Sequence, residues 1–318
     1  MLALAVTNVV AQIGIAVTGS VVRVTGSGLG CPTWPNCNPG SLTPAANPEL
    51  DPLHQWIEFS NRLLGVVVVV VAIACLLGAL TTAPRRRRLT VLATLMPAGV
   101  LAQGVIGGIT VLAGLSWWSV LPHFLASMAL IWLSVLLVSA AREDDVPAAP
   151  TVPGAVRGLV AASAAVLAVL LLAGTLVTAA GPHAGDAATP RLDAPVPALA
   201  SLHADLLFLY LGTLVGLGFA LRAVGAPAAL GRRFGVLVAM VLAQGALGGI
   251  QYALGVPELL VSLHVLGAGL VTAAASAVWA GTTTRPSPAT AARDVTSPPE
   301  PGEVVEQRPL ADATTDRP

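Results

Sequence analysis

The sequence predicts an all-α integral membrane protein with eight transmembrane helices, arranged as two four-helix bundles related by a parallel repeat. Its 318 residues are 55% hydrophobic and only 10% charged, which is too little charge to cover a soluble surface of this size. One short motif also recurs together with a histidine at a fixed distance, which indicates a duplication. Composition therefore predicts the membrane, and the repeat predicts two halves.

Eight apolar runs are long enough to cross about 30 Å of hydrocarbon, which takes roughly 20 helical residues. We expect the first run to be a retained helix, because no basic segment precedes it and no small-residue cleavage site stands out. Its abrupt start at Met1 is consistent with a true start codon further upstream. The runs lie at about 2–22, 56–80, 89–112, 117–140, 156–180, 199–222, 233–254 and 260–281.

The repeat divides these runs into four per half. Leu-Ala-Gln-Gly at 101–104 returns 141 residues later at 242–245, and each copy is followed by Gly-Gly-Ile. His123 and His264 each lie 20 residues after the glutamine of their copy. An even number of helices per half keeps both halves in the same orientation, so the repeat is parallel.

The predicted domains follow from this division. Residues 1–145 form an N-terminal four-helix half, with an outer cysteine loop at 23–53, and residues 146–281 form a C-terminal four-helix half. Residues 282–318 are rich in proline, threonine, alanine and charge, which predicts a disordered tail.

The arginines predict the orientation. The chain has no lysine, and its arginines gather in the connections that follow even-numbered helices, whereas the opposite connections hold little beyond Arg23 and Arg191. By the positive-inside rule, both termini are cytoplasmic in a multi-pass protein of the cell membrane. The clustered arginines are Arg85, Arg86, Arg87, Arg88, Arg142, Arg157, Arg222, Arg232 and Arg233.

Four of the five histidines fall near the start of an even-numbered helix, in the outer part of the membrane: His54, His123, His203 and His264. Polar residues at membrane depth are costly and are functional candidates by default. Imidazoles that face each other across a four-helix bundle commonly hold heme iron. The pattern predicts a heme-type protein with two sites; the alternative is a set of core histidines bonded to backbone carbonyls.

The second helix carries a dense polar stripe. His54, Glu58, Asn61 and Arg62 share one helical face, and Glu58 and Arg62 have the spacing of an ion pair. One interpretation makes Glu58 a carboxylate beside a ligand pocket, suited to proton transfer or to steering a substrate. The other makes it half of a neutralised pair that packs one helix against another.

The outer loop contains Cys31 and Cys37 on the oxidising side of the membrane. Two cysteines this close are expected to pair and to close a small loop. A metal site or a redox dithiol is the alternative, which is weaker because this loop holds neither a histidine nor a third cysteine.

These residues resemble the heme A synthase family. The resemblance covers residues 1–281 and rests on Arg-Val-Thr-Gly-Ser-Gly-Leu-Gly-Cys-Pro-x-Trp-Pro-x-Cys from Arg23, Ile-Glu-x-x-Asn-Arg from Ile57, and Gly-Pro-His-Ala-Gly-Asp from Gly181. It implies oxidation of the C8 methyl of heme O to a formyl group, through successive hydroxylations and loss of water. The product would be heme A.

The resemblance also implies roles for individual residues. His203 and His264 match the axial ligands of a heme b cofactor, and Glu58 matches a catalytically important glutamate. The N-terminal half would take the substrate heme, and the paired cysteines match Cys31 and Cys37. Implied partners are heme O, the lipid bilayer, a heme O synthase and an electron donor, but no nucleic acid.

One position departs from the family pattern. The family commonly has a histidine three residues after the glutamate, where this chain has Asn61. Either His54 replaces that histidine, or His123 alone holds the substrate heme and the opposite face is open or weakly bound. The sequence favours an open position, which would suit oxygen chemistry.

Two other functions remain compatible with the sequence. A diheme b-type electron-transfer protein would need a complete histidine pair at both sites, and Asn61 argues against that. A heme carrier or assembly subunit without chemistry would not need Glu58.

Overall fold

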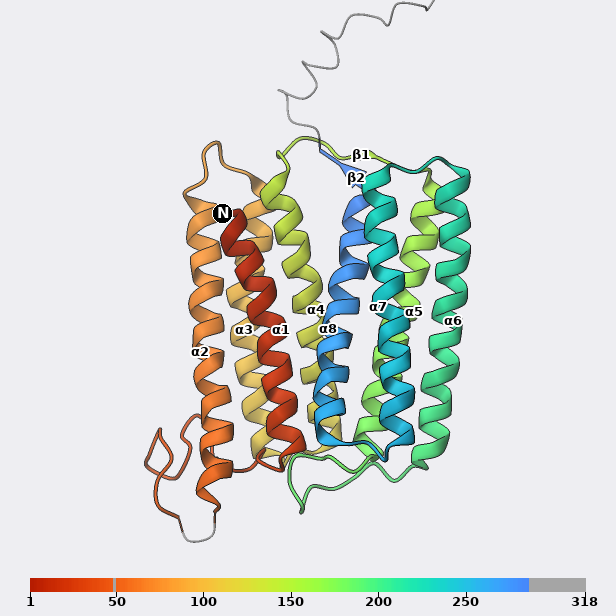
Figure 1. Ribbon diagram of the computed structural model, residues 1–318. Helices are drawn as coiled ribbons and strands as arrows, with labels where there is room; N and C mark the ends of the chain where they lie inside the picture. Colours follow the sequence, from red (N-terminus) through yellow and green to blue (C-terminus); the bar gives the residue numbers. More distant parts are fainter. Residues whose placement is uncertain (48–49, 286–318) are drawn as a thin grey trace, which may run out of the picture. The chain divides into compact units, whose positions relative to one another are not determined.

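The computed structural model describes residues 1–47 and 50–285, and this part of the chain is almost entirely α-helical. Eight long helices lie side by side within it, with their connections at the two ends (Figure 1). Each is long and apolar enough to cross a membrane, so the chain is a multi-pass all-α membrane protein. The helices are α1 (Leu2–Val24), α2 (Pro52–Leu80), α3 (Arg87–Leu112), α4 (Trp117–Arg142), α5 (Gly154–Ala180), α6 (Val196–Ala223), α7 (Ala228–Ala253) and α8 (Glu258–Gly281).

Each predicted apolar run corresponds to one helix, and the differences lie mainly at the helix starts. Helix α2 begins at Pro52, earlier than the run at 56–80, because Asp51 caps it by accepting the Leu53 amide at 2.7 Å. Helix α7 likewise begins before its apolar run, directly after Pro227. The first turns of these helices are polar, so hydropathy alone places the helix starts too late.

The α3–α4 and α7–α8 hairpins turn in the same way. Gly114 and Leu115 have φ of 60° and 57°, and Gly255 and Val256, 141 positions later, have φ of 74° and 63°. In both turns the amide of the second residue donates to the carbonyl five residues earlier, at 2.9 and 2.8 Å. The duplicated sequence thus builds the same helix-ending turn twice.

The packing of the two halves differs. Helices α1 to α4 form a ring in which each packs against the next and α4 returns to α1. In the second half, α5 pairs with α6 and α7 pairs with α8, but α6 touches α7 only sparsely. Helices α1, α4 and α8 pack together where the halves meet. The structure therefore shows that the two hairpins match, whereas the equivalence of the two whole bundles stays a prediction.

Each half has its own buried core, and large apolar side chains also cover the outside. Met96 and Leu137 are fully buried in the first half, as are Tyr210 and Leu217 in the second. On the outer surface Phe219 is 73% exposed. Apolar side chains on both the inside and the outside are what a lipid environment requires.

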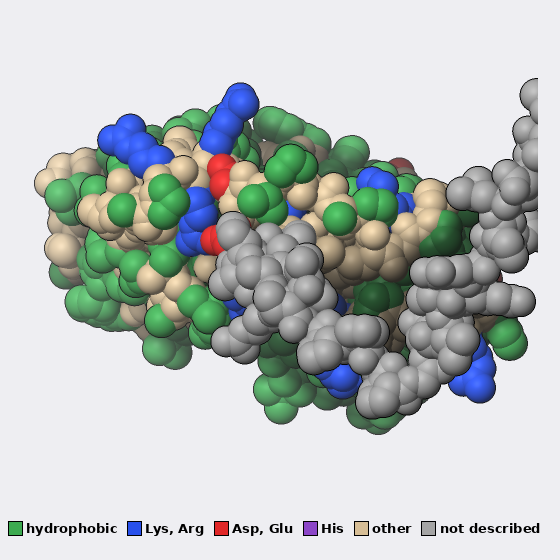
Figure 2. All heavy atoms as spheres, turned by 90° about the horizontal axis from the view of Figure 1, so that it is seen from above, with side chains coloured by type: hydrophobic (Ala, Val, Ile, Leu, Met, Phe, Trp, Pro, Cys, Tyr) green, Lys and Arg blue, Asp and Glu red, His purple; other side chains and the backbone are tan. Residues whose placement is uncertain are grey.

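The connections divide the molecule into two chemically different ends. The α1–α2, α3–α4, α5–α6 and α7–α8 connections lie at one end, which we call the disulfide end (Figure 1). Figure 2 looks onto the other, the arginine end, where blue arginine side chains gather. There Arg88 and Arg285 both pair with Glu143, at 2.5 and 3.5 Å.

A two-stranded ribbon that the sequence did not predict closes the arginine end. Strand β1 (Ala149–Pro150) pairs antiparallel with β2 (Thr283–Thr284), so the described chain continues in regular structure past the last helix. Composition predicts that residues 282–285 belong to the disordered tail, but Thr283 and Thr284 pair with β1 instead. The rest of that predicted tail, 286–318, lies outside the described residues.

Candidate functional site

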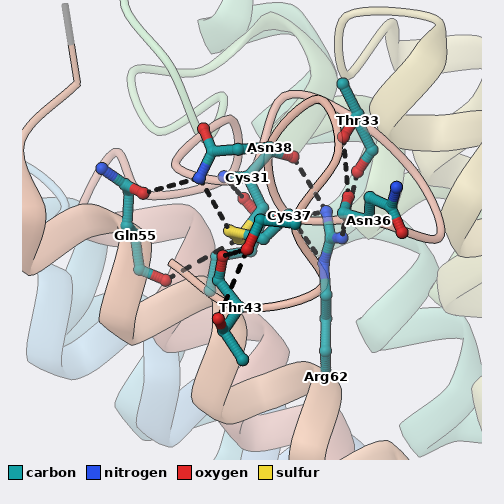
Figure 3. Close-up of a disulfide and its surroundings, with 10 residues drawn as sticks. Cys31, Thr33, Asn36, Cys37, Asn38, Thr43, Gln55 and Arg62 are labelled. Carbon is teal, nitrogen blue, oxygen red and sulfur yellow. Dashed lines mark hydrogen bonds and ion pairs between the residues drawn. A yellow bond between two sulfur atoms is a disulfide. The ribbon is translucent and has the colours of Figure 1, made fainter. Parts of the chain in front are cut away.

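Arg62 holds the connection between α1 and α2, residues 25–51, which we call the disulfide loop. Cys31 and Cys37 form a disulfide in this loop, as predicted, and both are 0% exposed. The Arg62 guanidinium lies inside the loop and donates to three of its backbone carbonyls (Figure 3). These are the carbonyls of Cys31 at 2.8 Å, Thr33 at 3.0 Å and Asn36 at 3.1 Å.

Glu58 completes this attachment. Its Oε1 accepts from Arg62 Nη2 at 2.5 Å and Nε at 3.1 Å, and its Oε2 accepts from the Cys31 amide at 2.7 Å. The residue is only 5% exposed. The ion pair forms at the predicted spacing, and both carboxylate oxygens are engaged with the disulfide loop and its arginine.

Two further contacts fix the loop on the first half. The Asn38 side-chain amide donates to Oε1 of the buried Gln55 at 3.0 Å (Figure 3). The Trp34 ring packs directly on Gly108 of α3, where a Cβ would leave no room for it. The loop thus spans α2 and α3 at the disulfide end.

The same loop contacts the second half. The Gly28 amide donates to the Gly185 carbonyl at 2.8 Å, and the Leu115 side chain packs against both glycines. Arg23, at the end of α1, donates to the His183 carbonyl at 2.5 Å and to the Thr178 carbonyl at 3.0 Å. The motif that begins at Arg23 therefore joins the halves as well as carrying the cysteines.

The α5–α6 connection is held in turn by its own arginine and histidine. Arg191 donates to the Gly181 carbonyl at 2.6 Å and to the Pro182 carbonyl, and desolvation lowers the pKa of its guanidinium. His183 contacts the α7–α8 turn through Nε2, which lies 2.8 Å from the Val256 carbonyl oxygen. His183 therefore links the α5–α6 connection to the α7–α8 turn.

His203 and His264 face each other inside the second half. Their ring centroids lie 6.4 Å apart and the ring planes are inclined by 62°. His203 Nδ1 lies 3.1 Å from the Leu170 carbonyl oxygen, so a proton on Nδ1 leaves Nε2 with a free lone pair. His264 Nδ1 is buried and has no hydrogen-bond partner among the described residues.

Glycines make room for these rings. A Cβ at Gly174 would lie 2.9 Å from Cε1 of His203, and a Cβ at Gly248 would lie 3.0 Å from Cε1 of His264. Gly107 stands in the same relation to His123, at 3.3 Å. Each ring therefore lies against helix backbone, which limits its rotation.

The duplicated glutamines hold the duplicated histidines. Gln103 donates to the His123 carbonyl at 2.9 Å, and Gln244 donates to the His264 carbonyl at 2.8 Å. In both hairpins the histidine Nδ1 and the glutamine Oε1 are buried and lack a partner within residues 1–47 and 50–285. The repeated Leu-Ala-Gln-Gly motif contains these glutamines, but the sequence alone does not reveal that each one binds the backbone of its histidine.

Among the described residues of the first half, no two histidine rings meet in this way. Within the described residues, ring contact between histidines is confined to His203 and His264. His54 lies two residues into α2, whereas His203 lies seven into α6, a difference of about 7 Å along a helix at 1.5 Å per residue. The His54 backbone instead packs against Gly30 of the disulfide loop.

Asn61 faces α1. Its Oδ1 accepts from the Thr18 hydroxyl at 2.7 Å, a contact that the sequence did not reveal. Both residues line a cavity of about 360 Å³ between α1 and α2. Asn61 is thus held by a neighbouring helix beside an open space.

Together the fold and these residues define a multi-pass helical membrane protein in which one half brings two histidine rings into contact and the other carries a disulfide loop held by Glu58 and Arg62. A family model described as cytochrome oxidase assembly protein (COX15-CtaA) matches residues 3–194, more than half of the chain. The chain belongs to this family of cytochrome oxidase assembly proteins.

Curated relatives agree with this assignment. The chain is 30% identical over 137 residues to heme A synthase of Geobacillus kaustophilus, covering 42% of this chain and 40% of the relative. It is 34% identical over 154 residues to heme A synthase of Shouchella clausii, covering 46% and 48%. It is 33% identical over 146 residues to heme A synthase of Lysinibacillus sphaericus, covering 44% and 46%. The matched stretch spans less than half the length of each relative.

Proposed function

We propose that this chain is a heme A synthase that oxidises the C8 methyl of heme O to a formyl group, with heme b as cofactor. The observation that carries the proposal is the asymmetry between the halves. One half has a facing histidine pair. The other has His123 against Gly107 and, on the neighbouring Gly108, Trp34 of the loop that Glu58 and Arg62 hold. Membership of the family and the names of the relatives support it.

His203 and His264 fit the heme b cofactor. An iron bound by one nitrogen of each ring at about 2 Å would hold the ring centroids about 6 Å apart. The observed separation is 6.4 Å. The Leu170 carbonyl orients His203, and Gln244 holds the backbone at His264. When bound there, heme b supplies one-electron redox chemistry.

His123 is the proposed ligand of the substrate heme. Its ring lies against Gly107, and its backbone is held by Gln103, as at the equivalent His264. On α2, the hydrogen bond from Thr18 engages the Asn61 oxygen, and His54 lies near the start of the helix. These contacts support a substrate iron held on one face by His123, with the other position open.

Glu58 acts in this proposal as a positioning residue. Its two oxygens bind the Cys31 amide and Arg62, so it fixes the disulfide loop near the predicted substrate half. This contact accounts for the importance that the family resemblance gives to the glutamate.

The proposed setting is the cell membrane with both termini cytoplasmic. The arginine end would face the cytoplasm by the positive-inside rule, and the disulfide end would face the oxidising side. Heme O would arrive from the bilayer, supplied by a heme O synthase, and a separate partner would donate electrons.

The geometry favours this enzyme over a diheme electron-transfer protein. That alternative needs a bis-histidine site in each half. The described residues bring only His203 and His264 into contact.

Heme content of the purified protein tests the assignment of the two halves. We expect wild type to retain one low-spin heme b, His264→Ala to lose it, and His123→Ala to retain it but fail to bind heme O. Loss of heme b from His123→Ala and its retention in His264→Ala would reverse the assignment. Two low-spin heme b groups in wild type would favour electron transfer instead.

A further inference from the structure

The proposed function assigns no role to the cavity between α1 and α2. Its volume of about 360 Å³ lies within the range of about 300–1,000 Å³ for small-molecule sites. Val21 and Val22 line it from α1, and Ile57 and Leu64 line it from α2. It is therefore mostly apolar and lies between two membrane-spanning helices.

The cavity opens on the outside of the helix assembly. Trp56 and Val21, at its edge, are 54% and 38% exposed, and Ser60 is also exposed. Exposed apolar side chains on a membrane-spanning helix face lipid. A ligand that travels in the bilayer could therefore reach this cavity sideways.

The cavity also has a polar side. The Thr18 hydroxyl and the Asn61 side-chain oxygen meet there at 2.7 Å, and Ser60 of α2 also lines the cavity. The Asn61 side-chain nitrogen donates to no group within the described residues, and an unsubstituted acyl chain would leave it without a partner in an apolar setting. A hydrocarbon chain that carries a hydroxyl group satisfies both sides of the cavity.

We propose that this cavity binds the isoprenoid side chain of the substrate heme and is its entry from the membrane. This inference rests on the proposed function, because heme O carries a long isoprenoid chain with a hydroxyl group where heme b has only a vinyl group. The hydroxyl bonds the Thr18–Asn61 pair, and the isoprene units pack on the apolar walls. Asn61 thus hydrogen-bonds the isoprenoid side chain and does not bind the iron.

The selectivity comes from packing and hydrogen bonding. The isoprenoid chain is already in hydrocarbon before it binds, so the hydrophobic effect contributes little, as between membrane helices. We therefore expect about tenfold tighter binding of heme O than of heme b at the second site, the scale of one or two good contacts (about 1.4 kcal/mol for a tenfold change).

Heme titration of the purified protein that already holds its heme b tests this proposal. Heme O and heme b are titrated separately, and binding at the second site is followed by absorbance. Ser60→Phe places a ring across the cavity from an exposed position on α2, and Leu64→Phe does the same one turn further along that helix. Val70→Phe, 60% exposed on the same helix and outside the cavity, is the matched control.

We expect wild type and Val70→Phe to prefer heme O about tenfold, and both cavity variants to bind the two hemes equally. Equal binding of the two hemes by wild type would overturn the proposal and leave the proposed function standing. So would an unchanged preference in a cavity variant that folds. A wild type that keeps its first heme but binds no heme O would contradict the proposed function as well.

Discussion

Removing the Arg62 guanidinium should release the disulfide loop without unfolding the helices. The guanidinium makes five hydrogen bonds, three to loop carbonyls and two to Glu58. Because the substitution Arg62→Met keeps the length and apolar character of the side chain, it removes those bonds and leaves the Glu58 charge without its partner. The loop keeps its disulfide but loses its main attachment to α2.

The size of the effect follows from the burial of the pair. Breaking a buried ion pair costs about 3–5 kcal/mol, and the remaining partner is nearly buried. The side chain of Arg62 is 20% exposed and that of Glu58 is 6% exposed, so water screens the pair in part. We take about 3 kcal/mol, which raises the fraction of molecules with a released loop about 100-fold, at 1.4 kcal/mol per factor of ten.

The rate of disulfide reduction measures that fraction. Both cysteines are 0% exposed, so a soluble phosphine reaches the sulfurs only when the loop opens. The assay counts thiols by mass spectrometry after alkylation, in a Cys75→Ala background that removes the remaining free thiol. We expect Arg62→Met to be reduced about 100-fold faster than wild type.

Arg222→Met, at the end of α6, is the matched control and should be reduced at the wild-type rate. Thermal unfolding in the same detergent separates local opening from global loss of structure. A reduction rate for Arg62→Met within about threefold of wild type would refute the reasoning, because it would mean that the five bonds do not hold the loop.

Three further predictions concern the same groups. Glu58→Gln keeps an acceptor oxygen but loses the charge, so disulfide reduction should accelerate about tenfold, less than after loss of the arginine; an unchanged rate would contradict the positioning role. Gly248→Ala adds a Cβ 3.0 Å from the facing histidine ring, and overpacking of about 1–3 kcal/mol should weaken heme b binding about tenfold or more in a heme titration. Gly249→Ala, where a Cβ meets nothing within 4 Å, should bind heme b like wild type, and equal weakening of the two would count against the ring contact. Asn61→His restores the pattern common in the family, but position 61 meets Thr18 of α1, so we expect the signal of heme O bound by His123 to stay high-spin; a low-spin signal would show that position 61 reaches the iron.

Hydropathy predicted most of the fold because the bilayer imposes a simple rule. Every backbone group in hydrocarbon must be bonded within its own segment, so apolar runs of the right length become helices. The polar first turn of α2, with Asp51 as its cap, escaped this reasoning because it lies outside the hydrocarbon pattern. The pairing of β1 with β2 escaped it because two residues carry no periodicity.

The candidate site was predictable where the signal was local or duplicated. The repeat carried Gln103 and His123 together with their counterparts, and the structure joins each glutamine to its histidine. The short cysteine spacing predicted the disulfide. In both cases the relevant residues lie in one motif or in two copies of it.

Contacts between distant segments could not be predicted from one sequence. The partner of the second Glu58 oxygen is a backbone amide 27 residues away, and the Thr18–Asn61 bond joins two residues that are 43 positions apart in the sequence. Helical periodicity identifies the face that carries Glu58 but not what that face meets. The sequence therefore leaves open whether Glu58 acts on the substrate or positions the loop, and its partners support the positioning role.

Extracted heme from a host that makes heme O but no heme A tests the central claim most directly. Expression of this chain should convert heme O to heme A, and His264→Ala, expressed to the same level in the membrane, should leave heme O unconverted. Accumulation of heme O alone, in cells whose membranes contain the wild-type chain with its heme b, would contradict the account.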